Sequence, residues 1–301
     1  MIEGRERGWA LAAMGMLLVS TDSFFIRTAD FDSWTISFVF ACSSTVALGV
    51  FFLIRTKEPL HRALRREPWS LAGLALLSSA TQISFVAAVN HTAVSNVVVI
   101  VAATPIVSAG LAWLLLRERT SRRVAIAIAS TLFGVVIVVG GSFGSPTLDG
   151  DLLAILAVVL VSLSLVLWRR SPDIDRPLAL ALSSATMALI TAPFASIGEA
   201  PLRVFIAAGL MGLIFNPLGR LAYTTAPRYA PTAEVALFTP IETVAATMWA
   251  WVFFSERPSA PTVVGGAVVL VAVLYGTVGG RRRAIVGSTD LVMSSDPPNS
   301  T

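Results

Sequence analysis

The stretch from Ala112 to Ser121 reads AWLLLRERTS, and the stretch from Ala250 to Ser259 reads AWVFFSERPS. Both follow the pattern A-W-x-x-x-x-E-R-x-S, and each stands at the end of a long apolar run. One more apolar run follows each copy and ends in a Gly-Gly pair, at residues 140–141 and 279–280. The chain is therefore predicted to contain two related halves, residues 1–142 and 148–280, and a polar tail at residues 281–301.

Apolar residues dominate the composition. Hydrophobic residues make up 55% of the chain and charged residues only 13%, and the mean hydropathy is +0.78. A soluble domain carries charge on roughly a quarter of its residues, so most of this surface must face lipid rather than water. No run alternates apolar and polar residues as the strands of a membrane barrel do. The sequence therefore predicts an all-α integral membrane protein.

Ten apolar windows have about the 17 to 25 residues that a helix needs to cross a bilayer. They are Gly8–Ile26, Trp34–Ile54, Trp69–Val89, Ala93–Leu116, Val124–Gly141, Leu152–Trp168, Pro177–Ile197, Leu202–Tyr223, Ala233–Phe254 and Val263–Gly280. We interpret the first window as a retained helix rather than a signal peptide, because no small-residue cleavage site follows it. Ten transmembrane helices are therefore predicted, five in each half.

The loops between these windows share the positive charge unevenly. With the N-terminus placed in the cytoplasm, eighteen of the 22 Lys and Arg residues fall on the cytoplasmic side, three fall on the opposite side, and Arg220 lies within a helix. Cytoplasmic loops are enriched in Lys and Arg, so both termini are predicted to lie in the cytoplasm, with the protein in the cell (inner) membrane. Because five is an odd number of helices, the second half must be inverted relative to the first, as in secondary transporters.

These features resemble the drug/metabolite transporter superfamily, whose EamA-type members have two such halves. The resemblance covers nearly all of the chain from Gly8 to Gly280. The stretches that carry it are Thr104-Pro105 to Glu118-Arg119, its counterpart ending at Glu256-Arg257, Gly150-Asp151-Leu152-Leu153-Ala154, and Tyr223 ahead of Ala230-Pro231-Thr232-Ala233-Glu234. The resemblance implies alternating-access transport, often export, of metabolites or drug-like solutes. The chain departs from it in one respect, because many relatives carry an arginine in the second helix and Trp34–Ile54 has no charged residue.

Four charged side chains are predicted to lie within the membrane: Asp22, Arg220, Glu234 and Glu242. Each costs about 2.5 to 3.5 kcal/mol to insert, so each needs a role. Glu242 follows Pro240 and lies roughly 12 Å along its helix from Glu234, near the middle of the bilayer. A carboxyl group buried away from a cation can exchange a proton near neutral pH. Glu242 is therefore predicted to couple transport to protons or to anchor a cationic solute; the alternative is a protonated carboxyl that only packs against Ser or Thr.

The other three charges have two interpretations each. Arg220 and Glu234 are predicted at matching depths near the cytoplasmic side, where a salt bridge would act as an inner gate; Arg220 could equally extend toward the lipid headgroups. Asp22 lies in the outer half of the membrane. It could line the exit path, or pair with Arg27 one turn further on, and the structural interpretation is favoured.

Neutral side chains within the windows are weaker candidates. Gln82, Asn96 and Asn216 could form hydrogen bonds with a ligand, although polar side chains between membrane helices more often bond to each other. Trp113 and Trp251 could stack on an aromatic or cationic solute. Both lie near helix ends, where tryptophan commonly belongs to the interfacial belt. The repeated Glu-Arg pairs of the two motifs are predicted to cap helices and fix loops.

Several classes of function are excluded by the sequence. The single cysteine, Cys42, and the isolated His61 and His91 give no metal or haem constellation. No Gly-Lys-Ser/Thr phosphate loop is present, and the basic residues lie in short clusters rather than in a nucleic-acid-binding stripe. No cofactor, no metal and no nucleic-acid partner are therefore predicted. The expected partners are a small-molecule solute, membrane lipid and a second copy of the chain as a homodimer.

The function predicted from the sequence is secondary-active transport of a small solute, driven by protons or by another gradient, with export as the expected direction. The site is predicted between the halves, near Glu242 and the proline-bearing helices of Pro105 and Pro240. Two other classes remain open: an intramembrane enzyme acting on a lipid-linked substrate, and a non-transporting membrane subunit. An enzyme would need clustered acids or a nucleophile–base pair at one depth, and a subunit has no need of two inverted halves.

Overall fold

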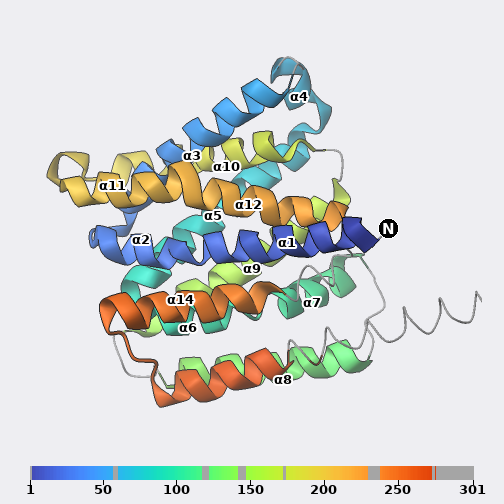
Figure 1. Ribbon diagram of the computed structural model, residues 1–301, viewed down its shortest axis with the longest axis vertical. Coiled ribbons are helices and arrows are strands. Elements are labelled where there is room, and N and C mark those ends of the chain that lie inside the picture. Colours follow the sequence, from blue (N-terminus) through green and yellow to red (C-terminus); the bar gives the residue numbers. More distant parts are fainter. Residues whose placement is uncertain are drawn as a thin grey trace, which may run out of the picture.

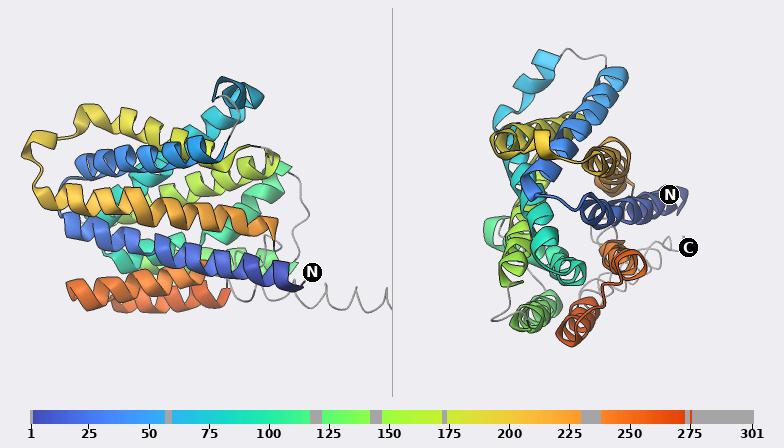
Figure 2. Two further views of the ribbon diagram at one scale, coloured as in Figure 1. Left: turned by 45° about the horizontal axis from the view of Figure 1, so that its top comes forward. Right: turned by 90° about the vertical axis from the view of Figure 1, so that its left-hand side faces the viewer.

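The computed structural model describes residues 2–56, 60–116, 122–141, 147–171, 174–229, 238–272 and 275. These residues form helices joined by short turns, and they contain no strand. The helices lie side by side with their axes along one common direction (Figure 1). The chain begins at one end of this bundle, which we call the N-terminal end; the opposite end, where α2 finishes, is the far end (Figures 1 and 2).

The first half of the chain folds into eight helical segments. They are α1 (Ile2–Val19), α2 (Thr21–Ala29), α3 (Ser33–Arg55), α4 (Leu60–Arg66), α5 (Pro68–His91), α6 (Val94–Val101), α7 (Thr104–Leu116) and α8 (Arg122–Gly140). The second half repeats the pattern of long helices joined by tight turns. Its segments are α9 (Leu148–Arg170), α10 (Arg176–Thr191), α11 (Leu202–Leu210), a π-helical turn (Met211–Phe215), α12 (Asn216–Thr225), α14 (Thr239–Phe254) and a last helix, Ala260–Ala272. Three 3₁₀ turns join them, at Ala192–Phe194, Ile197–Glu199 and Ala226–Arg228.

Within the described residues, six helical spans are long and apolar enough to cross a membrane. They are Glu6–Ala29, Ser33–Arg55, Pro68–His91, Leu148–Trp168, Arg176–Phe194 and Leu202–Thr225. Shorter apolar helices overlap the other four windows, at Val94–Ser108, Ala129–Val138, Val244–Phe254 and Ala260–Ala272. A helical, multi-span chain is thereby confirmed for the described residues, whereas the number of ten transmembrane helices stays a prediction.

Three of the expected continuous helices are interrupted. The first window breaks at Ser20 between α1 and α2, where the Ser20 hydroxyl donates to Leu17 O at 2.6 Å; such side-chain bonds bend helices. The fourth window breaks at residues 102–103, ahead of Pro105. The eighth widens into the π-helical turn ahead of Pro217. Proline has no N–H to bond the carbonyl four residues earlier, which explains the last two interruptions.

Helices of the two halves pack against each other in a reciprocal way. In the first half the third long helix, α5, lies along α9, the first helix of the second half. In return, α12 of the third long span of the second half lies along α1. The two second helices, α3 and α10, pack together. The start of α9 also lies beside the end of α2, because Asp151 bonds to Thr92 and Thr92 bonds to Arg27, so α1 and α9 run in opposite directions.

Glycine brings α1 and α12 into close contact. A Cβ atom placed on Gly15 would lie 2.8 Å from the carbonyl oxygen of Gly219, and one on Gly219 would lie 3.0 Å from the carbonyl oxygen of Gly15. Membrane helices use small residues for such approaches because lipid provides no hydrophobic force between helices. On the outside of the bundle, large apolar side chains are exposed as lipid-facing residues are. They include Leu53, Ile54, Trp69, Leu189, Val252 and Val271.

Candidate functional site

A cluster of polar side chains lies inside the bundle between α2, α12 and α14. We call it the central cluster; it consists of Asp22 on α2, Asn216 and Arg220 on α12, and Glu242 on α14. Asp22 is 2% exposed and Glu242 9% exposed, and Asn216 is buried. Polar groups so deep in a membrane protein are costly, and they usually mark ion or solute pathways.

Among the described residues, one oxygen of the Asp22 carboxyl has a hydrogen-bond partner and the other has none. Asn216 Nδ2 donates to Asp22 Oδ2 at 2.5 Å, across the two halves of the chain. Asp22 Oδ1 is buried and has no hydrogen-bond partner within the described residues. A buried acceptor without a partner costs free energy, and it calls for an explanation such as a catalytic or binding role.

The local backbone explains why Asn216 points at Asp22. The N–H of Asn216 bonds to the carbonyl of Met211, five residues back, so the helix is widened by one residue just before Pro217. On the partner side, Asp22 lies in the first turn of α2, directly after the break at Ser20. Both side chains are thus presented by interrupted helices, and π-helical turns of this kind occur frequently at functional sites.

Arg220 and Glu242 complete the central cluster. The charges of both act on the Asp22 carboxyl, Glu242 as a like charge and Arg220 as an opposite one. Arg220 lies one turn beyond Asn216 on α12, where protein surrounds it, although part of its side chain remains accessible. Among the described residues no acid comes within ion-pair distance of Arg220.

Trp249 lies at the level of the Ser20 break. Its Nε1–H donates to the Ser20 hydroxyl at 3.1 Å, which ties α14 to the junction of α1 and α2. Glu242 precedes Trp249 by two helical turns, or roughly 10 Å. The central cluster therefore extends along the bundle axis, with Asp22 and Asn216 closer to the far end and Glu242 closer to the N-terminal end.

The predicted site residues divide into three groups. The structure brings Asp22, Arg220 and Glu242 together, with Asn216 among them. Pairing of Asp22 with Arg27 is wrong, because Asp22 bonds to Asn216 and Arg27 bonds to Glu256. Glu234 lies outside the described residues, so its pairing with Arg220 stays a prediction.

The structure places the remaining neutral candidates, those other than Asn216, in different surroundings. Gln82 on α5 has a buried amide nitrogen without a partner among the described residues. Asn96 belongs to a different network at the far end. Trp251 is 59% exposed on the outside of the bundle, as an interfacial tryptophan would be. The side chain of Trp113 lies outside the described part of the structure, so no statement is made about its stacking.

A second set of polar contacts closes the far end. Arg27 at the end of α2 donates from Nη2 to Thr92 O at 2.6 Å and forms an ion pair with Glu256 Oε1 at 3.3 Å. The same Glu256 oxygen accepts the N–H of Val94 at 3.0 Å, in the first turn of α6. Glu256 thus joins the end of α14 to two elements of the first half, α2 and the start of α6, whereas the sequence predicted only that the Glu-Arg pair caps its helix and fixes a loop.

A buried network lies beside these contacts. Thr92 Oγ1 donates to Asp151 Oδ1 at 2.9 Å, and Asn96 Nδ2 donates to both Asp151 oxygens at 3.3 and 3.5 Å. The Thr262 hydroxyl donates in turn to Asn96 Oδ1. Gly150 allows the close approach, because a Cβ there would lie 2.7 Å from Thr92 N. The start of α9 is therefore joined firmly to the turn between α5 and α6.

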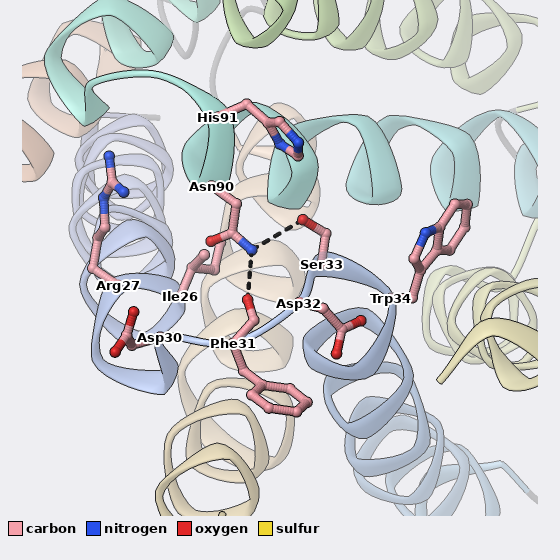
Figure 3. Close-up of a pocket in the computed structure, with 9 residues that line it drawn as sticks. All are labelled: Ile26, Arg27, Asp30, Phe31, Asp32, Ser33, Trp34, Asn90 and His91. Atoms are coloured by element: carbon pink, nitrogen blue, oxygen red, sulfur yellow. Dashed lines mark hydrogen bonds between the residues drawn. The ribbon is translucent and has the colours of Figure 1, made fainter. Parts of the chain in front are cut away.

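The far end also carries a surface pocket of about 470 Å³ (Figure 3). Its lining residues come from the turn between α2 and α3 and from the end of α5: Ile26, Arg27, Asp30, Phe31, Asp32, Ser33, Trp34, Asn90 and His91. Asn90 reaches across it, and its Nδ2 donates to Phe31 O at 3.0 Å and to Ser33 Oγ at 2.9 Å. Asp32 caps α3 through Thr35 N. The polar side chains of the pocket thus have structural roles in holding the turn.

Comparison with known proteins gives a family and a fold. The sequence pattern described as the EamA-like transporter family matches twice, over residues 6–140 and residues 148–277. A solved structure described only as "Crystal structure of protein" is similar over 92% of this chain and 99% of its own, with 17% identity and a TM-score of 0.66. At that identity the likeness shows the fold alone. No curated protein matches the sequence.

Proposed function

The chain belongs to the EamA-like transporter family, and on this premise we propose that it exports a small metabolite or drug-like solute by secondary-active, alternating-access transport. Membership of the family makes it a multi-pass membrane protein of the transporter kind. The solute, the direction of movement and coupling to protons are parts of the proposal.

The proposed orientation places the N-terminal end of the bundle in the cytoplasm and the far end outside, in the inner membrane. The distribution of Lys and Arg supports it. The proposed architecture is ten transmembrane helices in two inverted halves, residues 1–142 and 148–280. The opposite directions of α1 and α9 and the reciprocal packing of α5 on α9 and α12 on α1 support this arrangement. Inverted halves give a solute site near the bilayer midplane that can open to either side.

We propose the central cluster as the coupling and solute site. The observation that carries this proposal is the bare, buried Oδ1 atom of Asp22, next to the charges of Glu242 and Arg220. A carboxyl oxygen in this setting can accept a cationic group or a proton, while Arg220 can bind an anionic group of the solute. Glu242 is the proposed proton carrier, because within the cluster it lies toward the N-terminal end of the bundle, the proposed cytoplasmic side.

Arg220 and Glu234 remain the proposed inner gate. Arg220 has no ion pair among the described residues, which fits a side chain that changes partner between states. A salt bridge that forms in one state and breaks in the other is a common element of such switches. The charge reversal described in the Discussion tests this pair.

An intramembrane enzyme would need a nucleophile beside the acids. The hydroxyls closest in sequence to Asp22 are already engaged, because Thr21 donates to Leu18 O at 2.7 Å and Ser23 donates to Ser20 O at 3.3 Å. This observation favours transport over hydrolysis at the central cluster.

The test of the proposed function is a metabolite profile of cells that lack the protein, cells that overproduce it and cells that overproduce Glu242→Gln. Export predicts one or more solutes that accumulate inside the deletion strain and outside the overproducing strain. Proton coupling predicts that a protonophore abolishes the difference. An unchanged profile across all strains, with the protein present in normal amounts, would overturn the proposal.

A further inference from the structure

The second copy of the repeated motif places Glu256 where it can reach the first half of the chain. Helix α14 ends at Phe254, and Ser255 adopts a left-handed conformation (φ 56°) that turns the chain. The N–H of Glu256 then bonds back to Ala250 O at 3.2 Å. In this position the Glu256 carboxylate contacts Arg27 of α2 and the N–H of Val94 at the start of α6. Negative charge is favoured at a helix N-terminus by the helix dipole.

An aromatic layer lies directly under these contacts. Phe24 packs edge to face on Phe253, with the ring centroids 5.1 Å apart, and lies 5.7 Å from Phe254. Phe25 packs against Phe215 of the π-helical turn at 4.9 Å. Since Phe24 and Phe25 follow Asp22 by two and three residues, the layer lies between the central cluster and the far end. The polar contacts of Glu256 and the aromatic layer therefore lie on the far-end side of the central cluster, with the 58% exposed Phe253 ring at the outer edge of the layer.

The Glu256 contacts and the Asp151 network at the far end differ in their exposure to water and in how fully their oxygens are hydrogen-bonded. The Arg27 and Glu256 side chains are 28% and 19% exposed, so water reaches the ion pair. Glu256 Oε2 is buried without a partner among the described residues, which leaves the carboxylate half satisfied. By contrast, Asp151 is fully buried with both oxygens bonded, and Gly150 presses on the backbone of Thr92. The Glu256 contacts are therefore suited to release, and the Asp151 contacts are suited to remain closed.

We propose that the far end of the bundle acts as a gate, and that the contacts of Glu256 with Arg27 and the Val94 N–H break when this gate opens. The Gly150–Asp151–Thr92 contact stays intact in both states. The inference rests on the proposed alternating access. Release of Glu256 frees the end of α14, which lets Phe253 and Phe254 withdraw from Phe24 and opens the central cluster to the far side. An exposed ion pair between Arg203 and Asp30 also joins the halves at this end, but its side chains are 55% and 80% exposed and such pairs contribute little.

The experiment measures how fast a thiol at the level of Asp22 reacts from the far side. Ser20→Cys provides the thiol in a Cys42→Ser background, with Ser23→Cys as a second reporter if the first fails to fold. A membrane-impermeant thiol reagent is applied to intact cells and to inverted vesicles. We expect Glu256→Ala to raise the labelling rate from the far side about five- to thirtyfold, as for the loss of one or two kcal/mol of closed-state stability.

Two matched variants complete the design. Asp32→Asn removes a charge at the same end, at a residue that caps α3 within the first half rather than joining the two halves. This variant should leave the labelling rate unchanged. Gly150→Ala should lower the amount of folded protein without raising the labelling rate of what remains. An unchanged rate in folded Glu256→Ala would overturn the gate, and so would an equal increase in Gly150→Ala. The labelling assay needs no solute, so it tests the gate independently of transport. Faster labelling of Glu256→Ala would support the gate even if the metabolite profile of the strains were unchanged, a result that would overturn the proposed transport.

Discussion

Asn216 donates a 2.5 Å hydrogen bond to Asp22, and this bond joins the first helical span of one half to the third helical span of the other. It lies in the interior of the bundle, at a break in one helix and a π-helical turn in the other. Five predictions follow from the contacts around it.

Replacing Asn216 should remove the only donor that Asp22 has among the described residues. Asn216→Leu leaves a buried carboxylate with two unpaired oxygens, which costs about 1 to 3 kcal/mol, so we expect solute export to fall at least about tenfold. Asn90→Leu is the matched control, because it also removes a donating side-chain amide, but one that holds the turn between α2 and α3 at the far end. The measurement is export per folded molecule; equal losses in the two variants would contradict a role for Asn216 at the site.

The Glu242 carboxyl should carry the pH dependence of transport. Glu242→Gln keeps the size and polarity of the side chain but cannot exchange a proton, so we expect the remaining export to be insensitive to external pH and to a protonophore. The check is the export rate across a pH series in vesicles, for the parent and the variant. A variant that follows the pH profile of the parent would show that Glu242 has a packing role.

Arg220 and Glu234 should behave as an interchangeable pair if they form the inner gate. Each single reversal, Arg220→Glu or Glu234→Arg, is expected to lower export at least about tenfold, because it leaves like charges facing each other. The double reversal is expected to recover a large part of the activity. Additive defects would instead indicate that Arg220 interacts with Asp22 or with the solute, and not with Glu234.

The contact between Gly15 and Gly219 should tolerate no side chain. A Cβ on Gly15 meets backbone atoms of α12 at 2.8 Å, and backbone cannot move aside as a side chain can. Gly15→Ala is therefore expected to lower the melting temperature of the purified protein by several degrees. Gly49→Ala is the control, since a Cβ there has nothing within 4 Å, and alanine there should preserve or slightly raise stability.

The two neighbouring tryptophans of α14 should differ in importance. Trp249→Phe loses the N–H that donates to Ser20. We therefore expect reduced export and a lower melting temperature, because the folded state loses about 0.5 to 1.5 kcal/mol, the net contribution of one hydrogen bond. Trp251→Phe changes a side chain that faces outward and should alter neither quantity. A larger effect at Trp251 would mean that the outer face of α14 has a partner, such as a second copy of the chain.

Much of this fold could be predicted from the sequence, because the length of the apolar runs predicts the helices and the spacing of the repeated motif predicts the two halves. The helical windows and the two halves follow from local patterns. The contents of the central cluster did not follow in the same way. The windows are apolar on all sides, so periodicity gives no rotation for a helix, and nothing in the sequence indicates that Asp22 faces Asn216 rather than Arg27.

The spacing of Asp22 and Arg27 explains part of that error. Asp22 and Arg27 are five residues apart on α2, so they point to different sides of the helix. The direction of each side chain is set by packing between the halves, where Arg27 meets Glu256 and Asp22 meets α12. Contacts between residues so distant in the chain have no local signal in a single sequence.

The π-helical turn at Met211–Phe215 has a consequence for the direction of the side chains that follow it. Because the N–H of Asn216 bonds to the carbonyl five residues back rather than four, each later residue lies about 100° from the position that a continuous α-helix would give it. If this turn closed into a regular α-helix with all its residues kept, Asn216 and Arg220 would rotate together out of phase with Asp22. The arrangement of the central cluster thus depends on the geometry of a single helical turn.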